Sequence, residues 1–335
     1  FLGDWGLSRS LPLPAADEEA WPESIGVVGS GPASLSFAYQ MARRGYAVNM
    51  YEQDEIPGGM LRHAIPDYRL PKDVLDAEID RLLELNVTLH RKVDVGVAIS
   101  LDELRDTHAL LFLGLGAQAG RSLGIPGEQG PGVISGIEFL RRRKEHPESL
   151  ANRQVVVIGG GNTAIDAARS ALRDGASVTL MYRRTEKEMP AVDSEIQDAR
   201  AEGVAFRFLL APLEIVRDGD LVHHIRAQPM QLGEADEQGR RRPVPLVSLS
   251  QDLPADMVIA AIAQAPDWRG MGAVAAARDW LDTRTDGKLA DDIWAGGDDR
   301  GPGIAGAAIA QGRHAAEAAH AELRGLAPPQ QDERK

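Results

Sequence analysis

The sequence predicts an α/β protein with two similar domains, each a parallel sheet between layers of packed elements. Three observations carry this prediction. The chain has 335 residues, which is above the size at which one hydrophobic core stops growing. A short apolar strand over 25–29 is followed by a glycine-rich turn and a helix, and the same pattern returns from Val155 onward. A repeated opening unit in a chain of this length indicates two domains with related folds.

The net charge limits the kinds of partner that the surface can attract. Thirty-seven Lys and Arg against 50 Asp and Glu give 37 − 50 = −13. A surface of this sign repels nucleic acid and anionic membrane, so we expect neither as a partner. No apolar run approaches the ~20 residues that a membrane-spanning helix needs, and no secretory signal is visible. We therefore expect no membrane insertion and a cytoplasmic location.

The chain contains no cysteine. This excludes a disulfide framework, a catalytic thiol and a redox-active dithiol within these residues. It also excludes the usual cysteine ligation of an iron–sulfur cluster by this chain. We predict no metal site here.

The first strand leads into a helix over 32–44, which ends at Gly45, and then into a second strand over 47–52. The turn between strand and helix fills the pattern G-x-G-x-x-G/A, with Ser in the last position; its candidate contacts are Gly29, Gly31, Pro32, Ala33 and Ser34. Such a turn brings the free N–H groups of a helix N-terminus to a pyrophosphate. Glu52 lies 52 − 29 = 23 residues after the first glycine, where a carboxylate accepts hydrogen bonds from a ribose. We predict a dinucleotide-binding unit.

The second unit repeats the first at a constant spacing. Adding 130 to the positions of Gly29, Gly31 and Gly45 gives Gly159, Gly161 and Gly175. The expected elements are a strand over 155–159, a helix over 162–174 that starts with Asn162 and Thr163, and a strand over 177–183. Three glycines in one register predict a second nucleotide-binding unit.

The two units differ where the ribose would be recognised. The position 130 residues after Glu52 is Tyr182, and Arg183 and Arg184 follow it. A guanidinium binds a 2′-phosphate with two hydrogen bonds, whereas a carboxylate repels it. We therefore predict NADP(H) for the second unit, with NAD(H) as the alternative; the other reading of both arginines is that they are solvated surface charges.

The rest of the chain supplies the remaining elements. We expect a loop over 56–71, a helix over 72–85, a buried strand over 109–116, and short strands with turns over 205–260. The last strand covers 292–295, and a helix follows from about 305 to 324.

The segment after this last strand carries a family resemblance. Gly297 and Asp298, followed by Gly303 and Gly306, resemble the closing FAD motif of flavoproteins with two dinucleotide domains. The segments 58–61 and 65–71 resemble the flavin-side loop of the glutamate synthase small subunit, and 182–184 with 188–191 resemble its NADPH unit. The chain is also similar to the equivalent domains of dihydropyrimidine dehydrogenase. The resemblance runs from about residue 24 to 320.

The resemblance implies further contacts. Gly59, Met60 and Arg69 would contact FAD, and the Val93 backbone would meet its adenine end. The segment 261–263, including Ala261 and Ala263, would line the nicotinamide side of the second unit. The family usually has Gly at the positions of Ala64 and Ala263 here.

The resemblance also implies the domain order of glutathione and adrenodoxin reductases, with the NAD(P) domain inserted in the FAD domain. We expect an N-terminal arm or linker over 1–19, an FAD domain over 20–140 and 268–325, an NAD(P)H domain over 141–267, and a disordered tail over 326–335. In the family an iron–sulfur segment precedes the first glycine motif, and residues 1–13 resemble its tail. Either that segment lies upstream of Phe1 or a partner supplies it.

The implied function is hydride transfer between NADP(H) and FAD, with electrons passing to or from an iron–sulfur domain or subunit of a larger oxidoreductase. This transfer needs no protein acid or base, so no catalytic side chain is predicted. Two alternatives stay open: a stand-alone ferredoxin–NAD(P) reductase, and a non-catalytic FAD-binding scaffold subunit.

Overall fold

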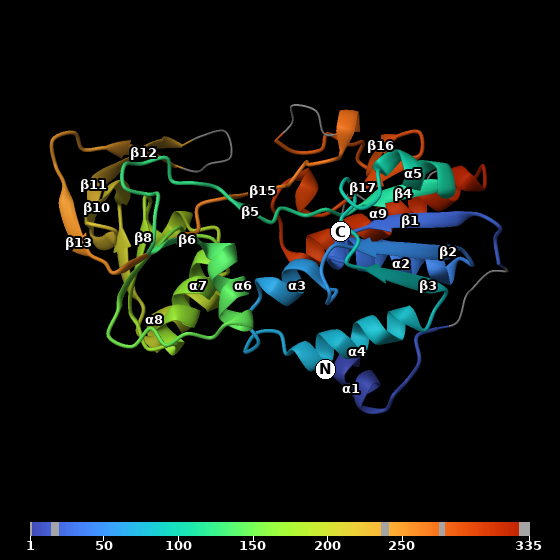
Figure 1. Ribbon diagram of the computed structural model, residues 1–335, viewed down its shortest axis with the longest axis horizontal. Coiled ribbons are helices and arrows are strands. Elements are labelled where there is room, and N and C mark those ends of the chain that lie inside the picture. Colours follow the sequence, from blue (N-terminus) through green and yellow to red (C-terminus); the bar gives the residue numbers. More distant parts are fainter. Residues whose placement is uncertain (1, 15–19, 236–240, 275–278, 328–335) are drawn as a thin grey trace. The chain divides into compact units, whose positions relative to one another are not determined.

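A computed structural model describes residues 2–14, 20–235, 241–274 and 279–327. The chain divides into two compact units (Figure 1). Unit 1 comprises Phe1–Gln118 and Ala265–Lys335, and unit 2 comprises Ala119–Gln264. The predicted α/β class is confirmed, and one unit is inserted in the sequence of the other.

Unit 1 is built on a six-stranded sheet with the order β16-β17-β4-β1-β2-β3. All neighbouring strands are parallel except β16, which runs antiparallel to β17. The strands are β1 (Ser24–Val28), β2 (Ala47–Glu52), β3 (Val87–Arg91), β4 (Leu110–Leu113), β16 (Lys288–Ala290) and β17 (Ile293–Ala295).

Helices and loops cover both faces of this sheet. The helices are α1 (Leu2–Ser8), α2 (Pro32–Arg43), α3 (Gly59–His63), α4 (Lys72–Leu83), α5 (Leu101–Thr107) and α9 (Ala305–Leu323), with short 3₁₀ turns η2 (Gly272–Val274) and η3 (Asp298–Arg300). On one face α2 and α9 pack on the strands, and Phe37 stacks on Phe112 with ring centroids 4.3 Å apart. On the other face Leu104 of α5 packs against Leu111 and Leu113 of β4.

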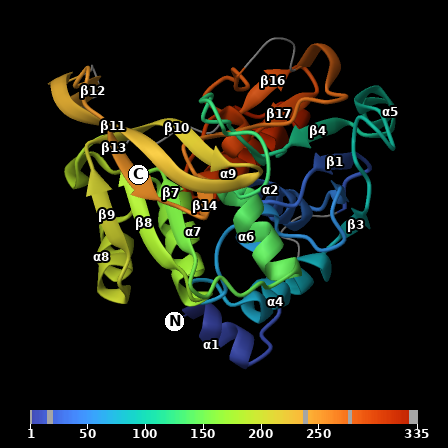
Figure 2. The ribbon, with the colours of Figure 1, turned by 60° about the vertical axis from the view of Figure 1, so that its left-hand side comes forward.

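Unit 2 has three layers. Its parallel sheet has the order β6-β14-β7-β8-β9, and an antiparallel sheet of β10, β11, β12 and β13 lies on one face (Figure 2). The strands are β5 (Ala119–Gly120), β6 (Val133–Ser135), β7 (Gln154–Ile158), β8 (Ser177–Tyr182), β9 (Ala205–Phe208), β10 (Leu210–Asp218), β11 (Leu221–Ala235), β12 (Arg241–Pro245), β13 (Gln251–Pro254), β14 (Met257–Ala260) and β15 (Gln264–Ala265). The helices are α6 (Gly136–Glu145), α7 (Asn162–Arg173) and α8 (Asp193–Glu202), with the 3₁₀ turn η1 (Glu186–Glu188). Val156 and Met181 pack against Ile225 between the sheets.

The 130-residue spacing holds at the level of whole elements. Shifting β1, α2 and β2 by 130 residues reproduces the bounds of β7, α7 and β8 at both ends. Each copy has an interior strand of its sheet followed by a helix and then by a parallel neighbouring strand. The repeat seen in the sequence is therefore a repeat in structure.

Some boundaries differ from the expected ones. Unit 2 begins at Ala119, whereas the second domain was expected from 141, because β6 pairs with β14 and α6 packs on α7. The segment expected to be an N-terminal arm contains α1, which lies against α4. Most of the predicted tail, from residue 328, lies outside the described residues.

Candidate functional site

The first glycine turn of unit 1 is tight because its backbone meets a neighbouring strand end. Gly29 has φ +87, and a Cβ atom there would lie 2.4 Å from the carbonyl oxygen of Gly114, just after β4. The Gly29 N–H donates to the Tyr51 carbonyl at 2.8 Å. Only glycine fits this conformation and this approach.

The turn leaves space beside an uncapped helix. Gly31 is the N-cap of α2, and no side chain caps the first N–H groups of this helix. A Cβ atom at Gly31 would meet no atom within 4 Å. Ser34, at the third position of the motif, is fully buried against the strand. Free N–H groups next to open space fit a pyrophosphate, as the motif predicts.

Glu52 lies beneath this turn. Its side chain is buried, and its carboxylate accepts hydrogen bonds from the Ser30 N–H and the Asp54 N–H, both at 2.9 Å, and from the Ser30 hydroxyl. A carboxylate has about four acceptor positions. The protein uses three of them here, which leaves one for a ligand hydroxyl.

Two further predicted contacts lie at the same turn. The Gly58 N–H donates to the Ser30 hydroxyl at 3.0 Å, and a Cβ at Gly59 would lie 2.9 Å from the Gly31 Cα. The Val93 N–H donates to the Glu52 carbonyl at 2.9 Å, which places Val93 beside the end of β2. These contacts bring the predicted adenine, ribose and phosphate residues of unit 1 together.

Met60 and Arg69 lie in the segment that follows Gly59. Met60 is in α3, and its carbonyl accepts from the N–H groups of Ala64 and Ile65 at 3.0 and 3.1 Å. Arg69 is half-buried further along the loop, and its N–H donates to the Pro66 carbonyl at 3.0 Å. The loop therefore starts at the glycine turn and carries both residues on a locally hydrogen-bonded backbone.

The last predicted FAD segment also reaches the first turn. Gly297 approaches α2 closely, since its missing Cβ would lie 3.2 Å from the Ala33 Cβ. Asp298 follows, and its carboxylate accepts from the Gly303 N–H at 3.1 Å. Burial raises the pKa of Asp298. Gly306 lies in the first turn of α9, next to open space.

Asp299, next to the predicted contact Asp298, is a buried acid that the sequence analysis did not single out. Its side chain is 0% exposed, and one carboxyl oxygen accepts from the Leu115 N–H at 3.2 Å. Burial raises the pKa of Asp299 well above its ordinary value. The hydrogen bond from Leu115 thus ties η3 to the loop after β4. The signal in the sequence was the second of two consecutive aspartates after an apolar strand.

The second glycine turn, in unit 2, repeats the geometry of the first. A Cβ atom at Gly159 would lie 2.2 Å from the Ala261 carbonyl oxygen, just after β14, and the Ala261 N–H donates to the Ile158 carbonyl at 2.8 Å. Gly161 is the N-cap of α7, again without a side-chain cap. The nearest atom to its missing Cβ is a ring carbon of Pro190 at 4.0 Å.

The residues under the second turn are different. A Cβ at Gly160 would lie 2.5 Å from the ring of Tyr182, so the ring packs directly on the turn. The Tyr182 hydroxyl donates to the Glu188 carbonyl at 2.8 Å, and the Ala191 N–H donates to the Gly160 carbonyl at 3.2 Å. The segment 185–192 thereby lies against the turn.

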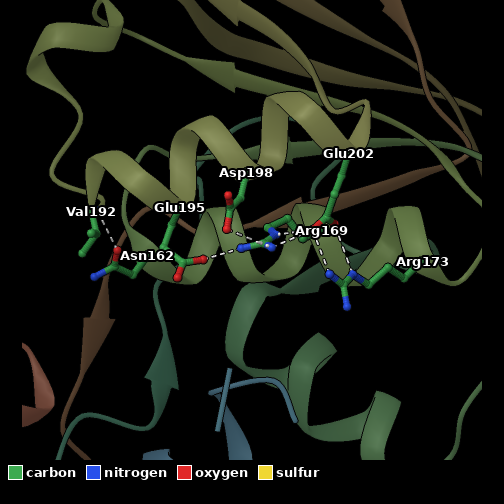
Figure 3. A network of polar contacts seen from close by, with 7 residues as sticks. All are labelled: Asn162, Arg169, Arg173, Val192, Glu195, Asp198 and Glu202. Atoms are coloured by element: carbon green, nitrogen blue, oxygen red, sulfur yellow. Dashed lines mark hydrogen bonds and ion pairs between the residues drawn. The ribbon is translucent and has the colours of Figure 1, made fainter. Parts of the chain in front are cut away.

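Asn162 and Thr163 use their side chains within the protein. The Asn162 side-chain oxygen accepts from the Val192 N–H at 3.0 Å (Figure 3). The Thr163 hydroxyl accepts from the Gln264 amide at 3.0 Å. Their backbone N–H groups are the part that faces the expected cofactor position at the helix N-terminus.

The two arginines predicted to bind the 2′-phosphate differ in their exposure and in their hydrogen bonds. The Arg183 side chain is exposed, and no hydrogen bond or ion pair to another described residue engages it. The Arg184 side chain is half-buried and donates to the Arg241 carbonyl of β12 at 2.8 Å. Arg183 is therefore the available guanidinium at the end of β8. Ala263 is exposed after β14, and its carbonyl accepts from the Arg121 N–H at 3.2 Å.

A buried arginine joins the helices beside the second turn. Arg169 of α7 is 5% exposed and pairs with three carboxylates of α8, those of Glu195, Asp198 and Glu202 (Figure 3). Arg173 adds a pair to Glu202 at 2.8 Å. These arginines hold the pKa of Glu202 at about 2. The network fixes α8, whose first residue follows the Val192 that bonds to Asn162.

Among the described helices, none is long and apolar enough to cross a lipid bilayer.

The chain is similar to subunits of several known oxidoreductases. The NADP(+)-dependent formate dehydrogenase subunit beta of Moorella thermoacetica is 43% identical over 249 residues, covering 73% of this chain and 35% of that protein. The glutamate synthase [NADPH] small chain of Azospirillum brasilense is 32% identical over 342 residues, covering 96% of this chain and 71% of that protein. The predicted resemblance to glutamate synthase small subunits is thereby confirmed. The chain spans 35% to 52% of the length of the first four curated relatives.

Solved structures confirm the fold. FprA of Mycobacterium tuberculosis in complex with NADPH has a TM-score of 0.77 at 21% identity, over 91% of this chain and 85% of that one. The thioredoxin reductase of Lactococcus lactis has a TM-score of 0.67 at 20% identity, over 91% and 100% of the two chains. The pyridine nucleotide-disulphide oxidoreductase family matches residues 23–312. Although it contains no cysteine, the chain belongs to the pyridine nucleotide-disulphide oxidoreductase family.

Proposed function

We propose that the chain binds FAD at the turn of unit 1 and NADP(H) at the turn of unit 2, and that hydride passes between the two cofactors. One observation carries the proposal: two uncapped helix N-termini stand behind glycine turns of the same geometry but differ at the ribose corner. A single binding turn would serve one dinucleotide, whereas two unlike turns serve two different ones.

The FAD assignment is supported by the convergence of separate segments on the first turn. Glu52 retains one acceptor position for a ribose hydroxyl. Gly59 and Gly297 reach the turn from other parts of the chain. The open position at Gly31 leaves room for the pyrophosphate. Met60, Arg69 and Asp298 would then contact the flavin half.

The NADP(H) assignment is supported by Arg183. Its guanidinium is exposed and free to bind a 2′-phosphate, while no carboxylate occupies the position that matches Glu52. Ala261 and Ala263 follow β14 beside Gly159, where the nicotinamide half would pass. Several relatives are named for NADP or NADPH.

The chemistry resides in the bound cofactors, which supply the hydride donor and acceptor. The protein residues bind and orient. The helix N-termini bind phosphates, Glu52 and Arg183 distinguish the two adenosine halves, and the buried Ser34 and Ala164 let helix and strand pack closely. We assign no proton transfer to any side chain.

The electron path beyond FAD leads, in this proposal, to an iron–sulfur domain or subunit of a larger oxidoreductase. The relatives include proteins named as beta subunits or small chains. This chain covers only part of their length, and it has no cysteine with which to hold such a cluster.

Anaerobic mixing with NADPH tests the proposal. Bleaching of the flavin absorbance, faster with NADPH than with NADH, is the expected result. A flavin that stays oxidised would indicate a scaffold subunit and overturn the proposed hydride transfer. Full activity with added ferredoxin and no partner would instead favour a stand-alone reductase.

A further inference from the structure

The flavin-side loop, residues 58–71, starts at the phosphate turn and ends at α4. Its first residues are fixed there by the Gly58 N–H bond to Ser30 and by the contact of Gly59 with Gly31. The rest of the loop carries Met60 and Arg69 away from the turn on a backbone that belongs to no sheet. Beyond these local backbone hydrogen bonds, one group from outside the loop helps to hold its shape.

Lys72, the first residue of α4, supplies that group. Its ammonium donates to the carbonyl oxygens of Leu61, Ile65 and Leu70 at 2.9, 2.8 and 2.9 Å. An ammonium has three N–H groups, and the three carbonyls can accept all of them. The ammonium also lies 3.7 Å from the carboxylate of Asp67, on the same loop. The side chain is 16% exposed, which limits competition from water.

The three carbonyls have a structural need for this cation. Leu61 lies near the end of the short helix α3, where carbonyls lack helical N–H partners. The Ile65 N–H bonds to the Met60 carbonyl at 3.1 Å instead of that of Leu61. The Lys72 ammonium binds three backbone oxygens, which come from both ends and the middle of the loop.

We propose that Lys72 is a positioning residue for the flavin: by gathering these carbonyls it holds Met60 and Arg69 where FAD contacts them. The proposal rests on the proposed function, which places FAD in unit 1. Lys72 itself touches no reacting atom.

The absence of cysteine allows a direct test. In Lys72→Cys the new thiol is the only one in the chain, so bromoethylamine converts it alone to a side chain of nearly the length of lysine with a terminal ammonium. Methyl methanethiosulfonate gives a side chain of similar length without a donor. Both products are made in denaturant and refolded with FAD in the same way.

Lys288→Cys, treated identically, is the matched control. Lys288 lies in the same unit, its side chain is 14% exposed, and its ammonium pairs with Glu322 at 2.6 Å rather than with the loop. Replacing Lys288 removes the contact of a lysine about as buried as Lys72, and it leaves the contacts of residues 58–71 unchanged. The readouts are the FAD dissociation constant, the visible circular dichroism of the bound flavin, and amide exchange of residues 58–71.

We expect Lys72→Cys to bind FAD about tenfold more weakly or worse, with a changed flavin dichroism and faster exchange in the loop. The ammonium product should restore all three readouts, and the methylthio product should not. The Lys288→Cys chain should bind FAD as the wild type does. Wild-type FAD affinity in Lys72→Cys, or equal rescue by both reagents, would overturn the proposal.

A second variant covers a failure of Lys72→Cys to refold. Lys72→Gln keeps two donors without the charge and is expected to bind FAD more weakly than the wild type; unchanged affinity overturns the proposal. Absence of FAD binding in the wild type would refute the assigned FAD site instead. Loop exchange in Lys72→Gln then still reports on Lys72, and exchange equal to that of the wild type would refute its role.

Discussion

The two copies of the strand–turn–helix unit share their backbone but not the contacts beneath the turn. In unit 1 the carboxylate of Glu52 accepts hydrogen bonds from Ser30. At the positions 130 residues later, the ring of Tyr182 packs on Gly160. The pair Ser30 and Glu52 of unit 1 is thus replaced in unit 2 by the pair Gly160 and Tyr182.

In the proposed binding mode, the residue that supports the turn is also the one that meets the ribose, so the two roles are coupled. The Gly160 position must lack a side chain because the Tyr182 ring occupies that space. Because Tyr182 stands where unit 1 has a carboxylate, Arg183 is the first charged residue after β8. A turn of one type therefore cannot be converted into the other by a single substitution.

The sharpest test of the comparison is to add one methyl group at the second glycine of each copy. Gly31→Ala and Gly161→Ala leave the fold intact, because φ is −71 and −91 and no protein atom lies closer than 4.0 Å to the new Cβ. We expect Gly31→Ala to weaken FAD binding, and Gly161→Ala to weaken NADP(H) binding, each by about tenfold or more. Calorimetric titration of each cofactor checks the cross pattern. Loss of both cofactors in either variant would contradict two separate turns.

Glu52→Lys tests the carboxylate beneath the turn of unit 1, which unit 2 lacks. The lysine removes the acceptors for Ser30 and Asp54 and places a cation beside their N–H groups. We expect purification without flavin, measured by the absorbance ratio at 450 and 280 nm. A variant with full flavin occupancy would refute the role of Glu52.

Arg169→Met tests the support behind the second turn only. It leaves the Glu195, Asp198 and Glu202 carboxylates without their shared cation, which costs about 3 kcal/mol when a buried partner is removed. We expect unit 2 of this variant to unfold at a lower urea concentration than unit 2 of the wild type. Amide hydrogen exchange in α7 and α8 measures this unfolding. The matched control is Arg313→Met, which breaks an exposed ion pair with Glu317 and should change stability by less than about 1 kcal/mol.

Separate substitution of the two arginines at the end of β8 gives a smaller, selective effect. Loss of one charge-assisted phosphate contact is worth about 1.5–3 kcal/mol, or roughly 10- to 100-fold. We expect Arg183→Ala to raise KM for NADPH by this factor and to leave KM for NADH nearly unchanged. Arg184→Ala should change both coenzymes alike, since Arg184 bonds to the hairpin strand β12. Equal, coenzyme-independent effects of the two variants would argue against phosphate recognition by Arg183.

The smallest expected effect is a different acid response of the two units. Burial, and next the neighbouring His90, lower the pKa of His108 below its ordinary 6.5. The unfolded chain therefore binds this proton more readily, and unit 1 loses stability as pH falls below 6.5. Glu202 contributes stability that is complete above its ordinary pKa of 4.5 and is lost as pH falls toward about 2.

Urea titrations at a series of pH values, with amide hydrogen exchange as the measure of unfolding in each unit, show which unit loses stability at the higher pH. His108→Gln should remove the upper step in unit 1, and Glu202→Gln should remove the lower step in unit 2. A common pH midpoint for both units would contradict the assignment.

The sequence predicted best where local chemistry and repetition agreed. The helices over 32–43 and 162–173 were expected within one residue of their observed ends, because glycines mark both termini. The helix α5 was missed, although Ser100 and Glu103 form a capping box that is visible in the sequence. The short α3 was expected as loop, since five residues carry too little periodicity.

The tertiary contacts of the site could not be predicted from the sequence alone. Nothing local indicates that Lys72 bonds to three loop carbonyls. Nor does it indicate that Arg184 bonds to β12 while no described side chain pairs with Arg183. The start of unit 2 at Ala119, rather than at the expected 141, was hidden for the same reason, because the pairing of β6 with β14 joins residues more than 100 positions apart. The roles given to the site residues stay predictions.

The short pair of β5 with β15 has a practical consequence. Ala119–Gly120 and Gln264–Ala265 are hydrogen-bonded neighbours where the chain enters and leaves unit 2. Because these two ends lie together, we expect residues 119–264 to tolerate excision or grafting with a short linker. In the proposed binding mode, coenzyme choice could then be changed by exchanging unit 2 without redesign of unit 1.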